Sequence, residues 1–350
     1  MSYSAASFLQ GPCHQNLFNA CHSAIIVIEQ LCTSGGTFLT WVVFVAFVLV
    51  LLWIDLAIFH KKTHSVSIRE ALVWALVWFG LAMAFNVFVW YECGAKIGLE
   101  FFTGYLIEKS LSVDNLFVIL LIFTAFSIPA KLQHRVLFWG IVGALVMRGL
   151  LILIGAALIA QFDWIFYLFG AFLVYTGAKM FFTSDEKFDP HDSFAVRLLK
   201  RFVRVSKKSH NEAFFVKEKG KVAVTILFVA LVVVEFTDVI FAFDSIPAIF
   251  AITSNPFIVF TSNVFAILGL RSLYFVIAKA HDLFRHLKTG LAIILVFIGA
   301  KLLLKDFFHL NIFISLGVVL AVLVTSIAYS IVEQKMMKKV KTKKGPKKRR

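Results

Sequence analysis

Long apolar runs make up most of the chain, and short polar or basic segments separate them. Each run approaches the roughly 20 residues that an α-helix needs to cross the hydrocarbon core of a membrane. The predicted spans are 38–59, 71–90, 101–127, 136–160, 164–182, 222–251, 257–279, 289–304 and 311–332. The pattern therefore predicts an all-α polytopic membrane protein with about nine transmembrane helices, arranged as one transporter-like domain over 38–332.

The composition agrees with this class. Hydrophobic residues are 60% of the 350 positions and charged residues only 16%, with a mean hydropathy of +0.87. A soluble domain carries about 25% charged residues. The first 37 residues lack the basic start of a signal peptide, so we treat 1–37 as an external N-terminal segment.

Lysine and arginine are unevenly distributed within a formal net charge of +15. They gather in alternate loops, at 60–70, 129–135, 183–221 and 279–288, and in the tail 333–350. Basic loops stay in the cytoplasm, so the N-terminus is predicted outside and the C-terminus inside. The tail then reads as a solvated cytoplasmic segment near anionic lipid, and we expect no nucleic-acid partner.

All four cysteines, Cys13, Cys21, Cys32 and Cys93, fall on the predicted outer side. That side is oxidising in bacteria, so disulfides can form there. Zinc-binding spacings are absent from the sequence, and a redox-active pair has weak support.

Both halves of the chain place charged residues inside apolar runs in the same order: an acidic pair, an arginine and a lysine. Along the chain these are Glu108, Asp114, Arg148 and Lys179, and then Asp238, Asp244, Arg271 and Lys301. The acids are six residues apart in each half, and VYTGAKM matches VFIGAKL at four of seven positions. We infer a duplication of three spans, with repeat 1 at 101–182 and repeat 2 at 222–304. Because three is odd, the second copy is inverted, which is a common plan of secondary transporters.

The acids need a reason to lie in lipid, because each ionised side chain at a bilayer centre costs roughly 2.5–3.5 kcal/mol. Glu235 and Asp238 share a helix face, being three residues apart. Residues six apart share one only if the helix is interrupted, which Pro247 makes plausible. We therefore predict breaks in the third and sixth spans, with Asp114 and Asp244 as the central ligands of a midplane site.

The candidate ligands are carboxylates and one amide, without histidine or cysteine. They are Glu108, Asp114, Asn115, Glu235, Asp238 and Asp244. Oxygen donors of this kind suit Mn²⁺, Ca²⁺ or Mg²⁺. The ion is expected as a substrate, and no resident cofactor is expected.

The charges of this site do not balance on their own. Arg148 and Arg271 offset two of the five carboxylates, and a divalent cation with a proton would offset the rest. The alternative is that the acids and arginines only lock helices together. Asp55, near the end of the first span, is interpreted as a solvated or paired end charge.

Several stretches resemble the TerC family, most closely its Alx-type branch. They are TGYLIEKSLSVDNLFV, QHRVLFWGIVGAL, EFTDVIFAFDSIPAIFAIT and PFIVFTSNVFAILGLRSLYF, and the similarity runs from about 53 to 332. The resemblance implies a multi-pass protein of the bacterial inner membrane with repeated helices and intramembrane acids. It also implies Mn²⁺ export, a link to tellurium resistance by name, and protection of secreted metalloproteins from incorrect metal loading.

Other functions remain open at this point. A membrane-protein assembly factor could use the basic tail and the 183–221 loop, and a redox modulator could use the outer cysteines. An enzyme is not expected, because the sequence shows neither a nucleophile–base pair nor a phosphate-binding loop. Oxygen ligands fit Ca²⁺ as well as Mn²⁺, and no feature of the sequence indicates an oligomeric state.

Overall fold

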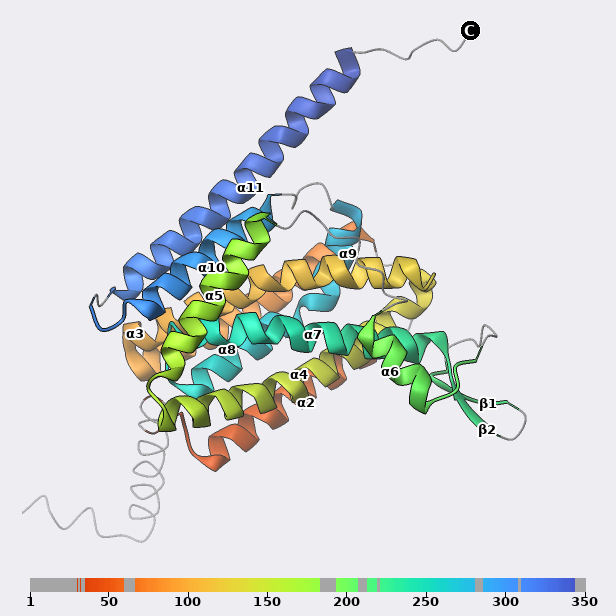
Figure 1. The fold of residues 1–350 in the computed structure, drawn as a ribbon, viewed down its shortest axis with the longest axis horizontal. Helices are drawn as coiled ribbons and strands as arrows, with labels where there is room; N and C mark the ends of the chain where they lie inside the picture. Colours follow the sequence, from red (N-terminus) through yellow and green to blue (C-terminus); the bar gives the residue numbers. More distant parts are fainter. Residues whose placement is uncertain are drawn as a thin grey trace, which may run out of the picture.

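The fold is a bundle of apolar helices with one small hairpin at its edge (Figure 1). This computed structural model describes residues 30, 32, 35–59, 67–182, 193–206, 213–218, 221–280, 286–307 and 310–343. Its elements are α2 (Phe38–Phe59), α3 (Ile68–Ala125), α4 (Ala130–Gln161), α5 (Ile165–Phe182), α6 (Phe194–Phe202), β1 (Phe215–Glu218), β2 (Lys221–Val224), α7 (Ile226–Phe250), α8 (Pro256–Leu268), α9 (Leu270–Ala280), α10 (Leu287–Leu303) and α11 (Ile312–Lys343).

The predicted all-α membrane class is confirmed. Five of the described helices, α2, α3, α4, α7 and α11, are long and apolar enough to cross a membrane, and the bent pair α8–α9 would be a sixth. Helices α5 and α10, with 18 and 17 residues, lie at the short end of the length that a crossing needs. The count of nine stays a prediction.

Two predicted spans fall in the single 58-residue element α3: all of 71–90, and 101–127 apart from its last two residues. The element changes direction at Gly94, whose φ of 84° and ψ of 170° are not helical. A positive φ of this kind is open to glycine and strained for other residues. Gly94 therefore divides α3 into two membrane-length segments without a loop between them.

The predicted breaks between the paired acids are wrong. Helix α3 is continuous from Gly94 to Ala125, and α7 is continuous through Asp238 and Asp244 with Pro247 inside it. Proline removes a single backbone donor, and near the end of a 25-residue helix this does not unwind the preceding turns. The broken span is instead α8–α9, whose two helices meet at Gly269 with a bend of 44°.

Helices α5 and α10 pack closely through their glycines, and the contacts are reciprocal. A Cβ atom on Gly177 would lie 2.8 Å from Cγ2 of Val296, and one on Gly299 would lie 2.8 Å from Cγ2 of Val174. Gly177 and Gly299, like Val174 and Val296, occupy matching positions in VYTGAKM and VFIGAKL. Helices related by a local twofold axis make contacts of this kind. The inverted repeat itself stays a prediction.

The connection between α5 and α7 holds structure that the sequence analysis did not foresee. The short helix α6 and the antiparallel hairpin β1–β2 lie together at one end of the bundle (Figure 1). The sixth span was predicted to begin at 222, but that position lies in β2, and α7 begins only at Ile226. The last helix runs beyond the predicted end at 332 to Lys343, into the basic tail, and extends away from the bundle.

A disulfide joins Cys32 to Cys93, with the two Cα atoms 5.2 Å apart. It ties the segment before α2 to the residue preceding the kink at Gly94. Cys13 and Cys21 lie outside the described residues, as does most of the predicted external segment 1–37.

The glycine contact between α5 and α10 gives a stability prediction. Gly177→Ala and Gly299→Ala place a Cβ atom 2.8 Å and 2.7 Å from a backbone oxygen of the other helix, so each should destabilise the protein by roughly 1–3 kcal/mol. Thermal unfolding of the detergent-solubilised protein should show a lower Tm. Gly80→Ala is the matched control, because a Cβ there meets nothing within 4 Å. Equal Tm values for the three variants would contradict this packing.

Candidate functional site

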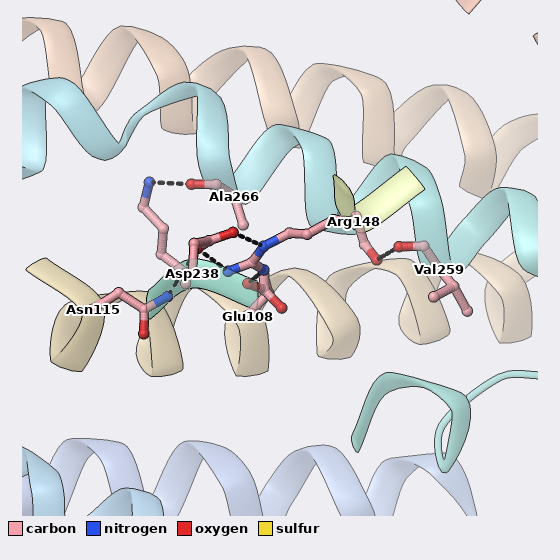
Figure 2. A network of polar contacts seen from close by, with 8 residues as sticks. Glu108, Asn115, Arg148, Asp238, Val259 and Ala266 are labelled. Carbon is pink, nitrogen blue, oxygen red and sulfur yellow. Dashed lines mark hydrogen bonds and ion pairs between the residues drawn. The ribbon is translucent and has the colours of Figure 1, made fainter. Parts of the chain in front are cut away.

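The centre of the bundle holds an arginine between two carboxylates. Arg148 on α4 is 1% exposed and forms an ion pair with Oε1 of Glu108, which comes from α3 and is fully buried. It also reaches Asp238 on α7, with Nη2 2.7 Å from Oδ1 and Nε 2.9 Å from Oδ2 (Figure 2). The bidentate pair fixes the plane of the guanidinium. One side chain therefore connects three helices in the membrane.

An amide completes this arrangement. Nδ2 of Asn115, on the same helix as Glu108, donates to Oδ1 of Asp238 at 3.3 Å (Figure 2). Among the described residues, no donor reaches Oε2 of Glu108 or Oδ1 of Asn115, although both atoms are buried. Buried acceptors are rarely left without a partner, so these oxygens need an explanation.

Glu235 lies one helical turn before Asp238 and faces α4. Its carboxyl group sits against Gly143, where the missing Cβ leaves the room that it occupies. Its Oε2 is buried and accepts no hydrogen bond from any described residue. The two acids lie close enough for their charges to interact. The prediction that Glu235 and Asp238 share a face is therefore confirmed.

The second acid of each pair points elsewhere. In a continuous helix, residues six apart differ by about 120° around the axis. Asp244 accordingly turns from α4 toward α5, where it is hydrogen-bonded by the side chain of Thr176. Asp114 is half-buried on α3, rotated from Glu108 by the same angle. The structure therefore brings the first acid of each pair, Glu108 and Asp238, together at Arg148, and not the second acids, Asp114 and Asp244, on which the sequence predicts that the site is centred.

Arg271 balances a different acid. Its Nη2 lies 2.6 Å from Oδ1 of Asp55 and 3.3 Å from the backbone oxygen of Asp55. Asp55 is 4% exposed, so of the two alternatives that the sequence left open, a solvated or a paired end charge, the structure supports the paired one. This buried pair joins α2 to α9. It lies outside the group formed by Arg148, Glu108, Asp238 and Asn115, which we call the Arg148 cluster.

Sequence reasoning also missed Lys109. Its Nζ donates to the backbone oxygen of Ala266 at 3.0 Å, near the end of α8. A Cβ on Gly269 would lie 2.8 Å from that Nζ, so the glycine at the bend makes room for the ammonium group. A basic residue at a helix C-terminus is electrostatically favourable. The only indication of this residue in the sequence was a lysine next to an acid, in EKS, within an apolar run.

As they stand, the acids do not form a ready metal site. Among the described residues, no three His, Cys, Asp or Glu side chains are grouped so that they could hold a metal ion. The guanidinium of Arg148 lies where Glu108 and Asp238 converge, and it supplies the positive charge there. A cation could use these two carboxylates only by displacing Arg148.

Comparison with known proteins supplies the relatives of this chain. A family model described as "Integral membrane protein TerC family" matches residues 93–338. The chain is 48% identical over 298 residues to "Putative membrane-bound redox modulator Alx" of Escherichia coli (strain K12), covering 83% of this chain and 93% of that protein. It is 47% identical over 295 residues to "Uncharacterized membrane protein STKORF319" of Myxococcus xanthus, covering 84% and 92%. No solved structure matches the chain.

The two buried arginines have separate carboxylate partners, and this predicts specific rescue. Arg148→Gln leaves two carboxylates buried without their counter-charge, which should destabilise the protein by roughly 3–5 kcal/mol. Adding Asp238→Asn should recover much of that loss. Arg271→Gln should be recovered by Asp55→Asn and not by Asp238→Asn. Thermal unfolding in detergent measures all five variants, and rescue of both arginine variants by the same partner would contradict the two separate pairs.

Proposed function

Because the chain belongs to the TerC family of integral membrane proteins, we propose that it exports a divalent cation across the bacterial inner membrane, with Mn²⁺ as its substrate. The proposal makes it a transporter and not an enzyme, with the bilayer and the ion as its partners. Oxygen ligands favour a hard divalent cation, and the choice of Mn²⁺ rests on the family resemblance. The N-terminus would lie outside and the C-terminus in the cytoplasm.

One observation carries the proposal. Three buried oxygens, Oε2 of Glu108, Oδ1 of Asn115 and Oε2 of Glu235, have no donor among the described residues. All three belong to residues in or beside the Arg148 cluster. A purely structural salt-bridge cluster should satisfy its buried acceptors. Acceptors left open in a membrane interior are what a transported cation would coordinate.

The proposed exchange is between the ion and Arg148. Two carboxylates and a divalent cation are formally neutral together, whereas Glu108 and Asp238 with Arg148 keep one negative charge. An arriving ion would thus satisfy the pair better than the guanidinium does. The displaced Arg148 cannot lose its proton and needs another acceptor, and Glu235 on the same face of α7 can provide one.

Return of Arg148 to the pair would then release the ion. Asp114 and Asp244 would complete the coordination sphere if α3 and α7 rotate as the site changes its accessible side, with proton exchange as the coupling that the charge balance favours. Arg271 takes no part in this cycle, because its charge is used by Asp55.

A redox modulator is the second candidate. The disulfide between Cys32 and Cys93 and the printed name of the Escherichia coli relative favour it. Among the described residues, this bond is separated along α3 from the Arg148 cluster, so the two candidate functions use different groups and can be tested apart. An assembly factor acting through the basic tail has no comparable structural observation.

Ion flux tests the transport proposal. Inside-out proteoliposomes would be offered Mn²⁺, Ca²⁺, Mg²⁺ and Zn²⁺. Wild type should take up Mn²⁺, and Glu108→Gln/Asp238→Asn should lose at least about tenfold of the flux, because charge-assisted ligands contribute roughly 1.5–3 kcal/mol each. Asp114→Asn/Asp244→Asn should also lose flux.

Asp55→Asn is the matched control for that experiment, because it leaves Arg271 without its buried counter-charge, as the cluster variant leaves Arg148, but outside the cluster. Its flux should stay within about twofold of wild type. The proposal fails if folded wild type moves no ion, or if both acidic double variants transport normally.

Cysteine replacement separates the second candidate from the first. Cys32→Ser/Cys93→Ser should retain most of the Mn²⁺ flux, since neither sulfur contributes to the acid cluster. Flux in proteoliposomes and the redox state of co-expressed periplasmic thiol reporters would be measured on the same variant. If the redox state of the reporters is the same as with wild type, the redox function is contradicted. If their redox state changes while the Mn²⁺ flux does not, the protein has both activities.

A further inference from the structure

A second polar region lies at the end of the bundle that carries the disulfide. It is a cavity of about 630 Å³ whose lining includes Lys96 and Glu100 from α3, Thr253 and Ser254 from the turn between α7 and α8, and Lys301 from α10. Alanine and isoleucine side chains near the end of α4 form an apolar wall.

Glu100 is the buried charge of this cavity. It is only 6% exposed. The hydroxyl of Thr253 donates to its carboxylate, and the positive charges of Lys96 and Lys301 act on it. Thr253 and Ser254, which also line the cavity, come shortly after the C-terminal end of α7 and so lie near the negative end of that helix dipole. The atoms that could bind a cation here are again hard oxygens, from a carboxylate and hydroxyl groups.

The cavity lies along the same helix as the Arg148 cluster. Glu100 and Glu108 are eight residues apart on the uninterrupted part of α3, which corresponds to about 12 Å along the axis. Thr253, which follows the end of α7, comes nine residues after Asp244 in the sequence. An ion leaving the cluster toward this end would pass along α3 and α7 into the cavity.

The disulfide indicates which side this end faces. Cys32 lines the cavity, and its partner Cys93 lies on α3 just before Lys96. Disulfides persist outside the cytoplasm, so this end faces the periplasm. Nδ2 of Asn255 also donates to the backbone oxygen of Cys32 at 3.4 Å, which holds the same segment against the start of α8.

We infer that this cavity is the exit station of the transport path, where the divalent cation is held briefly by Glu100 before release. The inference rests on the proposed export function and extends it to a second site. Glu100 attracts the ion, and the ammonium groups of Lys96 and Lys301 limit how strongly it is held. A carboxylate with two fixed cations gives a weak cation site, which suits a station that must empty and that should not admit the ion from outside.

Lys179 offers a matched control for Lys301. The two lysines occupy the same position in VYTGAKM and VFIGAKL. Lys301 lines the cavity, whereas Lys179 is exposed in the last turn of α5. Helix α5 begins just after the end of α4 that borders the cavity, so Lys179 lies at the opposite end of the bundle. Removing either charge changes the net charge equally.

The test is inhibition of Mn²⁺ efflux by Mn²⁺ on the outer side of the membrane. Proteoliposomes of one orientation would be loaded with Mn²⁺, and efflux would be followed at rising external concentrations. Lys301→Gln should be inhibited by roughly 3- to 10-fold less external Mn²⁺ than wild type, because one repulsive charge has gone. Lys301→Arg keeps the charge and should behave as wild type, and Lys179→Gln should not shift. Glu100→Gln should require more external Mn²⁺.

The outcomes separate this inference from the export function beneath it. If wild type moves Mn²⁺ but Lys301→Gln matches Lys179→Gln, or Glu100→Gln matches wild type, the exit station is wrong and export stands. If folded wild type moves no Mn²⁺, the export proposal itself fails. Gel filtration of each variant confirms folding before the comparison is made.

Discussion

A guanidinium group buried in the membrane interior constrains this whole structure. Arg148 cannot be neutralised by losing its proton, and an isolated charge is costly at that depth. It therefore requires carboxylates, and it finds them on two other helices, with Glu108 on α3 and Asp238 on α7. Helices α3, α4 and α7 are held in register by this requirement. The rotation of each helix is fixed by it too, because the acids must face α4.

That fixed rotation explains the arrangement of the remaining acids. With α3 and α7 continuous, the second acid of each pair lies about 120° from the first, so Asp244 turns to Thr176 on α5. In this structure the guanidinium of Arg148 therefore neutralises one group of carboxylates, and further carboxylates lie on adjoining helix faces. Such an arrangement holds a counter-charge in place of an ion, and it can present more oxygens only if the helices turn. Alternating access provides a turn of this kind in secondary transporters.

The class of the fold and most of the buried charged residues could be predicted from the sequence, for physical reasons. Runs of about 20 apolar residues have few alternatives to membrane helices, and an acid inside such a run is conspicuous whatever its geometry. Partners were harder to predict. The choice of Glu108 and Asp238 for Arg148, and of Asp55 for Arg271, depends on where helices bend. Pro247 was a visible but ineffective signal, whereas the bends occur at Gly94 and Gly269. The surroundings of Lys109 and Glu100 could not be predicted, because their contacts come from distant parts of the sequence, Ala266 and Thr253.

Equilibrium binding of Mn²⁺ to the purified protein tests the central claim most directly. The electron paramagnetic resonance signal of free Mn²⁺ would be titrated against wild type and against Arg148→Gln, at a temperature where both are folded. If the ion and the guanidinium compete for Glu108 and Asp238, wild type should bind a saturable ion and Arg148→Gln should bind it more tightly. Weaker binding in Arg148→Gln, or none in either protein, would contradict the account and leave Arg148 and its carboxylates as a structural link between helices.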